Sequence, residues 1–328
     1  MFDVLPRERF THLPTPLHRM DNLARSLGLR ELWVKRDDMT GMGCGGNKSR
    51  KLEYIVGDAR ERGADTLVTV GTVQSNHCRQ TAAAAALAGM RCVLLLSGEA
   101  PENPTGNILL DRLYGAEIVY CPRSDMGELQ ERMNNACTTL GELGLRPYAI
   151  PAGASVPLGV LAYVEAAAEL KEQSDNRGFT PDVIVVAAGT GGTLAGIALG
   201  AELVGLETQV VGISVQDERS VLENRVRELI HRTQREYPDL VGAVEPSFAV
   251  DDQFLEEGYG VVTESVKSMI HMFARTEGLL IDPVYTGKAA LGLSRMALSG
   301  ETPTDAHVVF WHTGGEPALH AYAGELLG

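Results

Sequence analysis

The sequence predicts an α/β protein built from mostly parallel β-sheets flanked by helices. Three observations lead to this prediction. Short apolar runs recur along the chain and are almost uninterrupted, as in strands that are buried on both faces. Stretches with helical spacing of apolar residues separate these runs. The length of 328 residues exceeds one typical domain and indicates two domains or one large α/β unit, and of these we expect two lobes, each with a mostly parallel sheet.

The candidate strands are short runs rich in β-branched and other apolar residues. In chain order they are LWVK (32–35), TLVTV (66–70), CVLLL (92–96), EIVY (117–120), VIVVAA (183–188), QVVGISV (209–215) and HVVFW (307–311). Helices are predicted at 48–62, 76–88, 125–143, 157–173, 191–204, 218–235, 261–275 and 287–298. This alternation of strands and helices is typical of parallel sheets.

One uncharged stretch, VIVVAAGTGGTLAGIALGA at 183–201, is long enough to cross a membrane. It divides, however, into a β-branched run, a glycine-rich turn and an alanine-rich helical pattern. A buried strand–turn–helix unit is therefore the better prediction, and no membrane association is expected.

The lobe boundaries are predicted from composition. The stretch PAGASVPLG at 151–159 is rich in proline, glycine and small residues, as a link between lobes would be. Residues 48–160 are expected to form the smaller lobe. Residues 1–47 and 161–328 are expected to form the larger one, because chain ends often pack on the larger domain. A ligand is expected in the cleft between the lobes.

Charge and cysteine usage narrow the class of protein. The chain has 29 basic and 43 acidic residues, a net charge of −14, so nucleic acid and anionic membrane surfaces are poor partners. The five cysteines include no CxxC pair, and the histidines show no HxH or HExxH spacing. These patterns predict reduced thiols in the cytoplasm and no metal site. The N-terminal MFDVLPRERF also lacks the apolar core of a signal peptide.

The first candidate for chemistry is Lys48, in GGNKSRKLEY (45–54). A single lysine at a helix start usually lies at the surface. Here two glycines allow the backbone to approach a ligand closely, and Asn47 can cap the helix or bind the ligand. A lysine held in such a pocket is the residue that forms Schiff bases with carbonyl cofactors.

The second candidate is GTVQSNHCRQT (71–81), which follows a predicted strand and opens a helix. The amides of Ser75, Asn76 and His77 would lie at the helix N-terminus, where a carboxylate is stabilised. The Ser75 hydroxyl is suited to proton transfer or ligand contact. An ordinary N-cap would give the same pattern, so this segment has no unique interpretation by itself.

The third candidate is AAGTGGTLAG (187–196), a glycine-rich turn between a strand and a helix. Its successive amides predict a nest for a phosphate. The spacing also resembles a loose dinucleotide fingerprint. Because Asp217 and Glu218 follow the next strand, an NAD-linked oxidoreductase stays open at this point.

Two further segments follow near the C-terminus. LLIDPVYTGKAALG (279–292) contains an Asp-Pro turn and Tyr285, a candidate for packing near a cofactor or moving a proton. HVVFWHTGGEPALHAY (307–322) contains a strand that ends at His312 and Thr313, where α/β sheets place ligand groups. Thr313 could bind a ring nitrogen, whereas His312 is more easily explained as a structural residue.

Together these segments supply a Schiff-base lysine, a carboxylate cradle, a phosphate nest and a ring-nitrogen partner, which fits pyridoxal phosphate with an amino acid. The chain resembles the ACC deaminase/D-cysteine desulfhydrase family of fold-type II pyridoxal-phosphate enzymes. The matching motifs, in the family's order, are PTPL (14–17), VKRDD (34–38), GGNKSRKLE (45–53), QSNHCRQTAA (74–83), GTGGT (189–193), EGYG (257–260), DPVYTGK (282–288) and HTGGEPAL (312–319).

This resemblance implies a role for each matching residue. Lys48 resembles the lysine that binds the cofactor and moves the substrate's α-proton, and Lys51 resembles a phosphate-side lysine. Asn76 resembles the partner of the cofactor's phenolic oxygen, and Ser75, Asn76 and His77 the substrate-carboxylate site. The phosphate loop of the family is matched by Thr190, Gly191, Gly192 and Thr193. Tyr259 and Tyr285 resemble the tyrosines on the substrate side, and Tyr285 is also expected to be catalytic. Thr313 resembles the partner of the pyridine nitrogen. The resemblance also implies a homodimer.

Two positions distinguish branches of this family. The ACC deaminase branch resembles DPVYEGK and HLGG, whereas this chain has Thr286 and Thr313. A carboxylate at the pyridine nitrogen makes the ring the deep electron sink that cyclopropane opening needs, and threonine supplies no such charge. The pattern therefore favours β-elimination from a sulfur-bearing amino acid and makes ACC deamination the less favoured activity.

The leaving group stays open between two branches. Hydrosulfide from D-cysteine is the first choice. Sulfite from L-cysteate is the alternative, because cysteate sulfo-lyases resemble the same family and share HTGG. A sulfonate would need an extra cation near the site, for which Arg79 and Arg219 are candidates. A non-catalytic relative that only carries pyridoxal phosphate is a third possibility. It is disfavoured because Ser75 and Tyr285 are retained beside the lysine.

Overall fold

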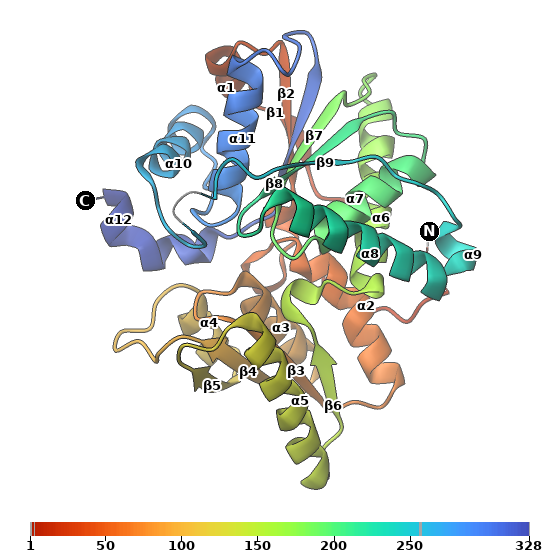
Figure 1. Ribbon diagram of the computed structural model, residues 1–328, viewed down its shortest axis with the longest axis vertical. Helices are drawn as coiled ribbons and strands as arrows, with labels where there is room; N and C mark the ends of the chain where they lie inside the picture. The colour runs from red at the N-terminus through yellow and green to blue at the C-terminus, as the bar shows by residue number, and fades with distance from the viewer. Residues whose placement is uncertain (1, 3, 256–257, 328) are drawn as a thin grey trace.

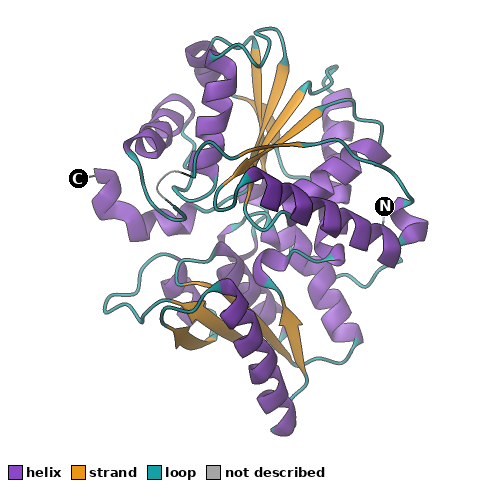
Figure 2. Ribbon diagram, viewed as in Figure 1, coloured by secondary structure: helices purple, strands orange, loops and turns teal. Residues whose placement is uncertain are grey.

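The structure is a computed structural model that describes residues 2, 4–255 and 258–327, and these residues form two β-sheets with helices packed around each (Figures 1 and 2). The strands are β1 (Leu17–Arg19), β2 (Glu31–Arg36), β3 (Thr66–Thr72), β4 (Arg91–Ser97), β5 (Glu117–Cys121), β6 (Pro147–Ile150), β7 (Val183–Ala188), β8 (Gln209–Ser214), β9 (Ala249–Asp251) and β10 (His307–His312).

The helices follow the strands closely along the chain. They are α1 (Asp21–Leu27), α2 (Lys48–Glu61), α3 (Asn76–Ala88), α4 (Asn107–Leu113), α5 (Met126–Glu142), α6 (Pro157–Asp175), α7 (Gly192–Leu203), α8 (Arg219–Glu236), α9 (Pro238–Val241), α10 (Glu264–Glu277), α11 (Thr286–Leu298) and α12 (Ala323–Leu327). Short 3-10 turns η1 (Asp37–Met39), η2 (Met42–Cys44), η3 (Ala152–Ala154) and η4 (Glu316–Tyr322) complete the described elements.

The larger sheet has the order β1-β2-β10-β7-β8-β9. Only the β1–β2 pair is antiparallel among its described strand pairs. The last strand, β10, lies in the middle of the sheet, where Val309 pairs with Trp33 of β2 on one side and Ile184 of β7 on the other. The sheet core therefore joins segments from both ends of the chain.

The smaller sheet has the order β5-β4-β3-β6, and all three strand pairs are parallel. It lies below the larger sheet in Figure 2, with α3, α4 and α5 around it. The prediction of an α/β fold with mostly parallel sheets is confirmed. The seven predicted strands and eight predicted helices all form, with ends that differ by a few residues.

The elements that the sequence did not predict are short. β6 has four residues, β1 and β9 have three each, and α1 and α4 have seven each. Segments of that length carry too few residues to establish a period. The division into lobes at residues 48 and 160 stays a prediction, because α2 packs against both α3 and α6.

The tightest helix packing lies between α6 and α7. A Cβ atom added at Gly196 would lie 2.3 Å from Tyr163 Cβ, and one at Gly200 would lie 2.7 Å from Ala167 Cβ. Glycine at these two positions allows the helices to approach so closely. The apolar 183–201 run thus becomes β7, a turn and α7, as predicted, and no helix of the described residues is long and apolar enough to span a bilayer.

A buried polar cluster fixes the start of α2 against the larger sheet. Asp37 is fully buried and accepts hydrogen bonds from Arg50 (2.9 Å), Tyr163 (2.6 Å) and Trp311 (2.9 Å). Glu169 of α6 accepts from Arg50 and from Lys35. Buried charges are tolerated when they are paired and hydrogen-bonded in this way. The cluster holds α2, which begins at Lys48, in a defined position.

Candidate active site

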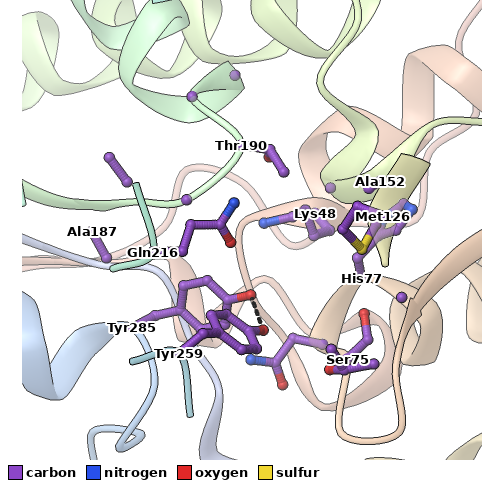
Figure 3. A pocket seen from close by; sticks show the side chains of 18 of the residues that line it. Lys48, Ser75, His77, Met126, Ala152, Ala187, Thr190, Gln216, Tyr259 and Tyr285 are labelled. Carbon is purple, nitrogen blue, oxygen red and sulfur yellow. Dashed lines mark hydrogen bonds between the residues drawn. The ribbon is translucent and has the colours of Figure 1, made fainter. Parts of the chain in front are cut away.

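A cavity of about 430 Å³ lies where the carboxyl ends of strands from both sheets meet (Figure 3). Its walls include residues that end or follow β3, β4 and β6 of one sheet, and β7, β8 and β10 of the other. The predicted site residues that line it are Lys48, Ser75, Asn76, His77, Thr190, Gly191, Gly192, Thr193, Tyr259, Tyr285 and Thr313. Predicted site residues as distant in sequence as Lys48 and Thr313 thus line the same cavity.

Lys48 is the first residue of α2, and its amine projects into the cavity in Figure 3. The preceding turn demands glycine: Gly45 has φ +71°, and a Cβ there would lie 1.7 Å from the Asp38 carbonyl oxygen. Lys48 Nζ donates to Asn47 Oδ1 at 3.0 Å. Burial lowers the pKa of Lys48 to about 8, although Asp282 acts in the opposite direction. A share of the amine is therefore neutral and available as a nucleophile near neutral pH, although most of it stays protonated below pH 8.

The N-terminus of α3 forms the opposite wall. Ser75 caps the helix, and its Oγ accepts from Cys78 N at 3.2 Å. The Ser75 amide donates to Thr72 O, so only the Asn76 and His77 amides of the predicted carboxylate cradle remain for a ligand. A helix N-terminus with two such amides favours an anion.

His77 has one fixed and one unused ring nitrogen. Thr69 gives its hydroxyl proton to Ile150 O (2.7 Å), so we assign the proton between Thr69 Oγ1 and His77 Nε2 (2.8 Å) to the ring. His77 Nδ1 is then a lone-pair acceptor, buried and without a partner among the described residues. Burial lowers the pKa of His77 well below its usual range, and Lys48 and Lys51 lower it further. The imidazole is neutral.

The glycine-rich turn before α7 forms a cradle. Gly191 has φ +86° and precedes the helix, which no described side chain caps. A Cβ at Gly192 would lie 2.7 Å from Ser155 Oγ and 3.0 Å from Lys51 Nζ. Asn47 Nδ2 donates to Thr193 Oγ1 at 3.0 Å and joins this turn to the Lys48 turn. Glycine at this position lets the turn pack against Ser155 and Lys51, and the uncapped backbone amides of the helix start are suited to an anion.

Lys51 is the one predicted site residue that does not line the cavity. It lies behind Gly192, 1% exposed, with Nζ 3.3 Å from Gly153 O. Burial and the nearby Lys48 lower its pKa well below the usual range. A positive or neutral amine directly behind an anion cradle is suited to a phosphate that lies in front of it.

Tyr259 and Tyr285 form a pair across the cavity wall. Their hydroxyls lie 2.6 Å apart, and the rings meet edge to face at 78° (Figure 3). Burial raises the pKa of both phenols. Buried Asp282 accepts from the amides of Val284 and Tyr285 at 3.0 Å and so fixes the turn that presents Tyr285. Glu257, in the predicted EGYG motif, lies outside the described residues.

The end of β10 presents Thr313 to the cavity. Thr313 is 8% exposed, and its carbonyl accepts from the Asn47 amide at 3.0 Å. The preceding His312 donates from Nε2 to Leu280 O (2.9 Å) and accepts from the Gly314 amide at Nδ1 (3.2 Å). His312 is therefore a structural residue, as the sequence favoured, and it shapes the turn that carries Thr313.

Several cavity residues were not predicted. Ser97, Ser124, Asp125 and Met126 line the side of the smaller sheet, and Gln216 and Asp217 line the side of the larger one. Ser97 ends β4 and the others follow strands, so the rule that ligands bind at the carboxyl ends of parallel strands could have found them. Among the described residues, no group of three or more His, Cys, Asp or Glu side chains is placed to hold a metal ion.

The donor set of the cavity fits pyridoxal phosphate. The cradle without a side chain at Gly192 suits its phosphate, the Lys48 amine its aldehyde, and the Thr313 hydroxyl its ring nitrogen. The free amides of α3 suit an amino-acid carboxylate. This geometry therefore defines a class of protein, the pyridoxal-phosphate-dependent enzymes.

Comparison with known proteins agrees with this class. Residues 9–314 match the family model described as pyridoxal-phosphate dependent enzyme, so the chain belongs to this family. The expected dependence on pyridoxal phosphate is thereby confirmed. This family does not support the NAD-linked oxidoreductase. Asp217, one of the two acidic residues that had kept that alternative open, accepts a hydrogen bond from Arg225 at 2.7 Å.

Individual relatives cover almost the whole chain. It is 40% identical over 321 residues to a Pyrococcus abyssi protein provisionally assigned as a 1-aminocyclopropane-1-carboxylate deaminase, covering 97% of this chain and 95% of that protein. It is also 40% identical over 329 residues to the D-cysteine desulfhydrase of Serratia proteamaculans, covering 97% and 96%. The crystal structure of an ACC deaminase homologue matches with a TM-score of 0.90 and 38% identity, over 98% of this chain and 96% of that one. The prediction of a pyridoxal-phosphate-dependent lyase is confirmed.

Proposed function

We propose that this enzyme catalyses β-elimination from a sulfur-containing amino acid, with D-cysteine as the substrate. One molecule of D-cysteine and one of water would give pyruvate, hydrogen sulfide and ammonia. The Serratia relative is a D-cysteine desulfhydrase, and Thr286 and Thr313 replace the glutamate and leucine of the ACC deaminase pattern. Thr286 Oγ1 lies 2.7 Å from Asp282 Oδ1 and is fully buried, so no carboxylate enters the cavity from this position.

The charged residues of the cavity wall favour hydrosulfide over sulfite as the leaving group. Among the described residues that line the cavity, Lys48 is the only lysine or arginine, and Asp125 and Asp217 are the acids. A sulfonate brings a second negative charge and would meet no cation beyond Lys48. Arg79 donates instead to Gly45 O (2.8 Å) outside the cavity wall, and Arg219 is exposed on α8. A neutral thiol suits this wall better than the sulfonate of L-cysteate.

Five features of the chain would hold the cofactor. Lys48 would bind its aldehyde carbon, Thr190–Thr193 with Lys51 behind them its phosphate, Asn76 its phenolic oxygen and Thr313 its ring nitrogen. When bound, pyridoxal phosphate supplies a ring that withdraws electrons from the substrate's α-carbon. The protein's contribution is to place its own groups around that carbon.

The remaining groups bind substrate and move protons. The free amides of Asn76 and His77 would hold the substrate carboxylate at the N-terminus of α3, beside the Ser75 hydroxyl. Lys48 Nζ would take the α-proton, because a pKa lowered to about 8 by burial keeps a share of the amine neutral near pH 7. The Tyr285 hydroxyl, held by Tyr259 at 2.6 Å, would lie at the substrate side chain and stay protonated there.

The decisive experiment is a substrate panel with the purified, cofactor-loaded enzyme. Keto-acid release would be measured from D-cysteine, L-cysteine, L-cysteate, D-serine and ACC, with sulfide and sulfite assayed in parallel. We expect the highest kcat/KM for D-cysteine, with equal amounts of pyruvate and sulfide. Sulfite from L-cysteate at a higher kcat/KM would instead identify a cysteate sulfo-lyase, and preferred deamination of ACC would overturn β-elimination.

Two further proposals concern the oligomeric state of the enzyme and its location in the cell. We propose a homodimer on the basis of the family resemblance, and light scattering of the purified protein would give its mass. We also propose a cytoplasmic location, because all five cysteines are free thiols. Cell fractionation with an antibody to the protein would check the location.

A further inference from the structure

Asn76 is held in one orientation by a chain of buried polar contacts. Its Oδ1 accepts from Asn107 Nδ2 at 2.8 Å and from Arg79 Nη1 at 3.3 Å. Asn107 is fully buried at the first position of α4, and Arg79 is fully buried on α3. These contacts bring together residues that are 31 positions apart in the sequence.

The direction of these contacts is set by Arg79. A guanidinium only donates, so the Asn107 atom 2.8 Å from Arg79 Nη1 must be the Oδ1 acceptor. Asn107 Nδ2 therefore faces two acceptors, Gln74 O at 2.8 Å and Asn76 Oδ1. Asn76 Oδ1 is turned toward these donors, which leaves Asn76 Nδ2 as the end of the amide available to the cavity.

Asn107 is fixed on its other side as well. Gln74 Oε1 accepts from the Asn107 amide at 2.8 Å, and Gln74 Nε2 donates to Thr105 O at 3.0 Å. Arg79 Nη2 also donates to Gly45 O, in the glycine turn that leads to Lys48. The same buried group thus connects the Asn76 amide with the turn that carries the lysine.

We propose that Asn107 is a positioning residue that, oriented by Arg79, presents the donor end of the Asn76 amide to the phenolic oxygen of the bound cofactor. The proposal rests on the proposed function, because it assumes that pyridoxal phosphate lies against Asn76. Without Asn107, the Asn76 amide can rotate and offer its acceptor end to an anionic oxygen. A buried acceptor facing an anion is unfavourable.

The test compares Asn107→Asp and Asn107→Ala with Asn135→Asp, an exposed control of the same charge change on α5. A donor to the phenolic oxygen favours the more negative, deprotonated form of the bound cofactor. We therefore expect the pH midpoint of the visible absorption band to rise by roughly one pH unit in Asn107→Asp and by less in Asn107→Ala. We expect kcat to fall roughly tenfold in Asn107→Asp, with no change in the control.

A double-mutant cycle separates positioning from the added charge. In an Asn76→Ala background, Asn107→Asp and Asn107→Ala should cause no further change in midpoint or kcat, because Asn107 acts through Asn76. Unchanged effects in that background would overturn the proposal, as would a folded Asn107→Ala enzyme with the wild-type midpoint and kcat. If Asn107→Asp does not fold, the midpoint and kcat of Asn107→Ala, alone and in the Asn76→Ala background, test the proposal.

The two proposals fail in distinguishable ways. If the wild-type protein develops no visible band with pyridoxal phosphate, the proposed function fails. If the wild-type protein shows the band and releases keto acid but the Asn107 variants behave like it, only the role of Asn107 fails.

Discussion

Arg50 and Asp37 form an ion pair closed off from solvent, with Nη2 2.9 Å from Oδ1 and Nε 3.1 Å from both carboxylate oxygens. Their side chains are 2% and 0% exposed. Arg50 lies two residues after Lys48 in α2, and its pairing with Asp37 joins this helix to the turn after β2. The position of the candidate catalytic lysine therefore depends on an interaction outside the cavity.

Loss of Asp37 should destabilise the whole protein. Asp37→Ala leaves Arg50 with only part of its partners and removes the acceptor for Tyr163 and Trp311, so we expect about 3–5 kcal/mol less unfolding free energy. Urea titration followed by circular dichroism measures this. Glu117→Ala, which breaks the exposed pair with Arg91, serves as the control and should cost less than about 1 kcal/mol. Equal losses in both variants would contradict the structural role of Asp37.

Lys48→Ala should abolish covalent attachment of the cofactor. The variant can still bind pyridoxal phosphate through its phosphate, but we expect no borohydride-stable adduct and a fall in kcat of at least about 10³-fold. Mass spectrometry after borohydride reduction and a keto-acid assay measure the two effects. Lys267→Ala, a change on α10 away from the cavity, should leave both unchanged. An adduct retained in Lys48→Ala would show that another amine carries the cofactor.

Cofactor attachment should accelerate with pH. Only the neutral amine of Lys48 attacks an aldehyde, and burial lowers its pKa to about 8. In the cofactor-free protein, the rate of band formation should rise through about pH 8 and level off above it. Stopped-flow absorbance at several pH values gives this profile. A midpoint near 10.5, the ordinary value for lysine, would mean that the amine is solvated.

Gly192→Ala should weaken cofactor binding. The new Cβ would lie 2.7 Å from Ser155 Oγ and 3.0 Å from Lys51 Nζ, so the turn proposed to hold the phosphate would have to shift. We expect a Kd for pyridoxal phosphate that is roughly tenfold higher or more, measured by fluorescence titration. Gly141→Ala, on the exposed face of α5 with open space around it, should leave the Kd unchanged and add about 0.5–1 kcal/mol of stability. A wild-type Kd for Gly192→Ala would place the phosphate elsewhere.

The free energy of unfolding should decrease as the pH rises, because Asp111 loses its proton. Both of its oxygens are buried without a hydrogen-bond partner among the described residues, and burial raises its pKa from 3.8 to about 7. The native state therefore binds more protons than the unfolded state between about pH 4 and 7, and stability is lost across that window as the pH rises. The loss is at most about 4 kcal/mol, since one pKa unit corresponds to about 1.4 kcal/mol.

Asp111→Asn tests this directly. The variant should gain stability over the wild type at pH 8 and little at pH 4, because an amide has no proton to lose. Urea titrations at the two pH values measure the difference. A gain of the same size at both pH values would show that Asp111 stays ionised throughout.

Much of the candidate site was predictable because its residues lie in local motifs, most of them at the ends of strands. Lys48, Ser75 and Thr190 occur in motifs with local signals, namely a glycine turn, a helix cap and a strand followed by glycines. Parallel strands bring Ser75, after β3, and Thr190, after β7, to the carboxyl edges of their sheets, whereas the glycine turn places Lys48. The resemblance to a known family added the assignment of individual roles to these positions.

The parts that escaped prediction depend on contacts distant in sequence. Asn107 follows a glycine in a loop and has no local pattern that points toward Asn76, and Asp37 acquires its partners from α2, α6 and β10. Lys51 resembled a phosphate ligand, yet it lies behind Gly192 instead of lining the cavity. Burial and side-chain direction arise from packing, which a periodic pattern does not specify.

The place of β10 between β2 and β7 has a consequence during biosynthesis. The ribosome releases this strand after all the other described strands, so until then the centre of the larger sheet lacks the strand that pairs with both β2 and β7. A nascent chain can complete the smaller sheet earlier, but Thr313 can accept from the Asn47 amide only after β10 has been made. Truncated chains that lack residues 307–328 are therefore unable to assemble a finished cofactor site.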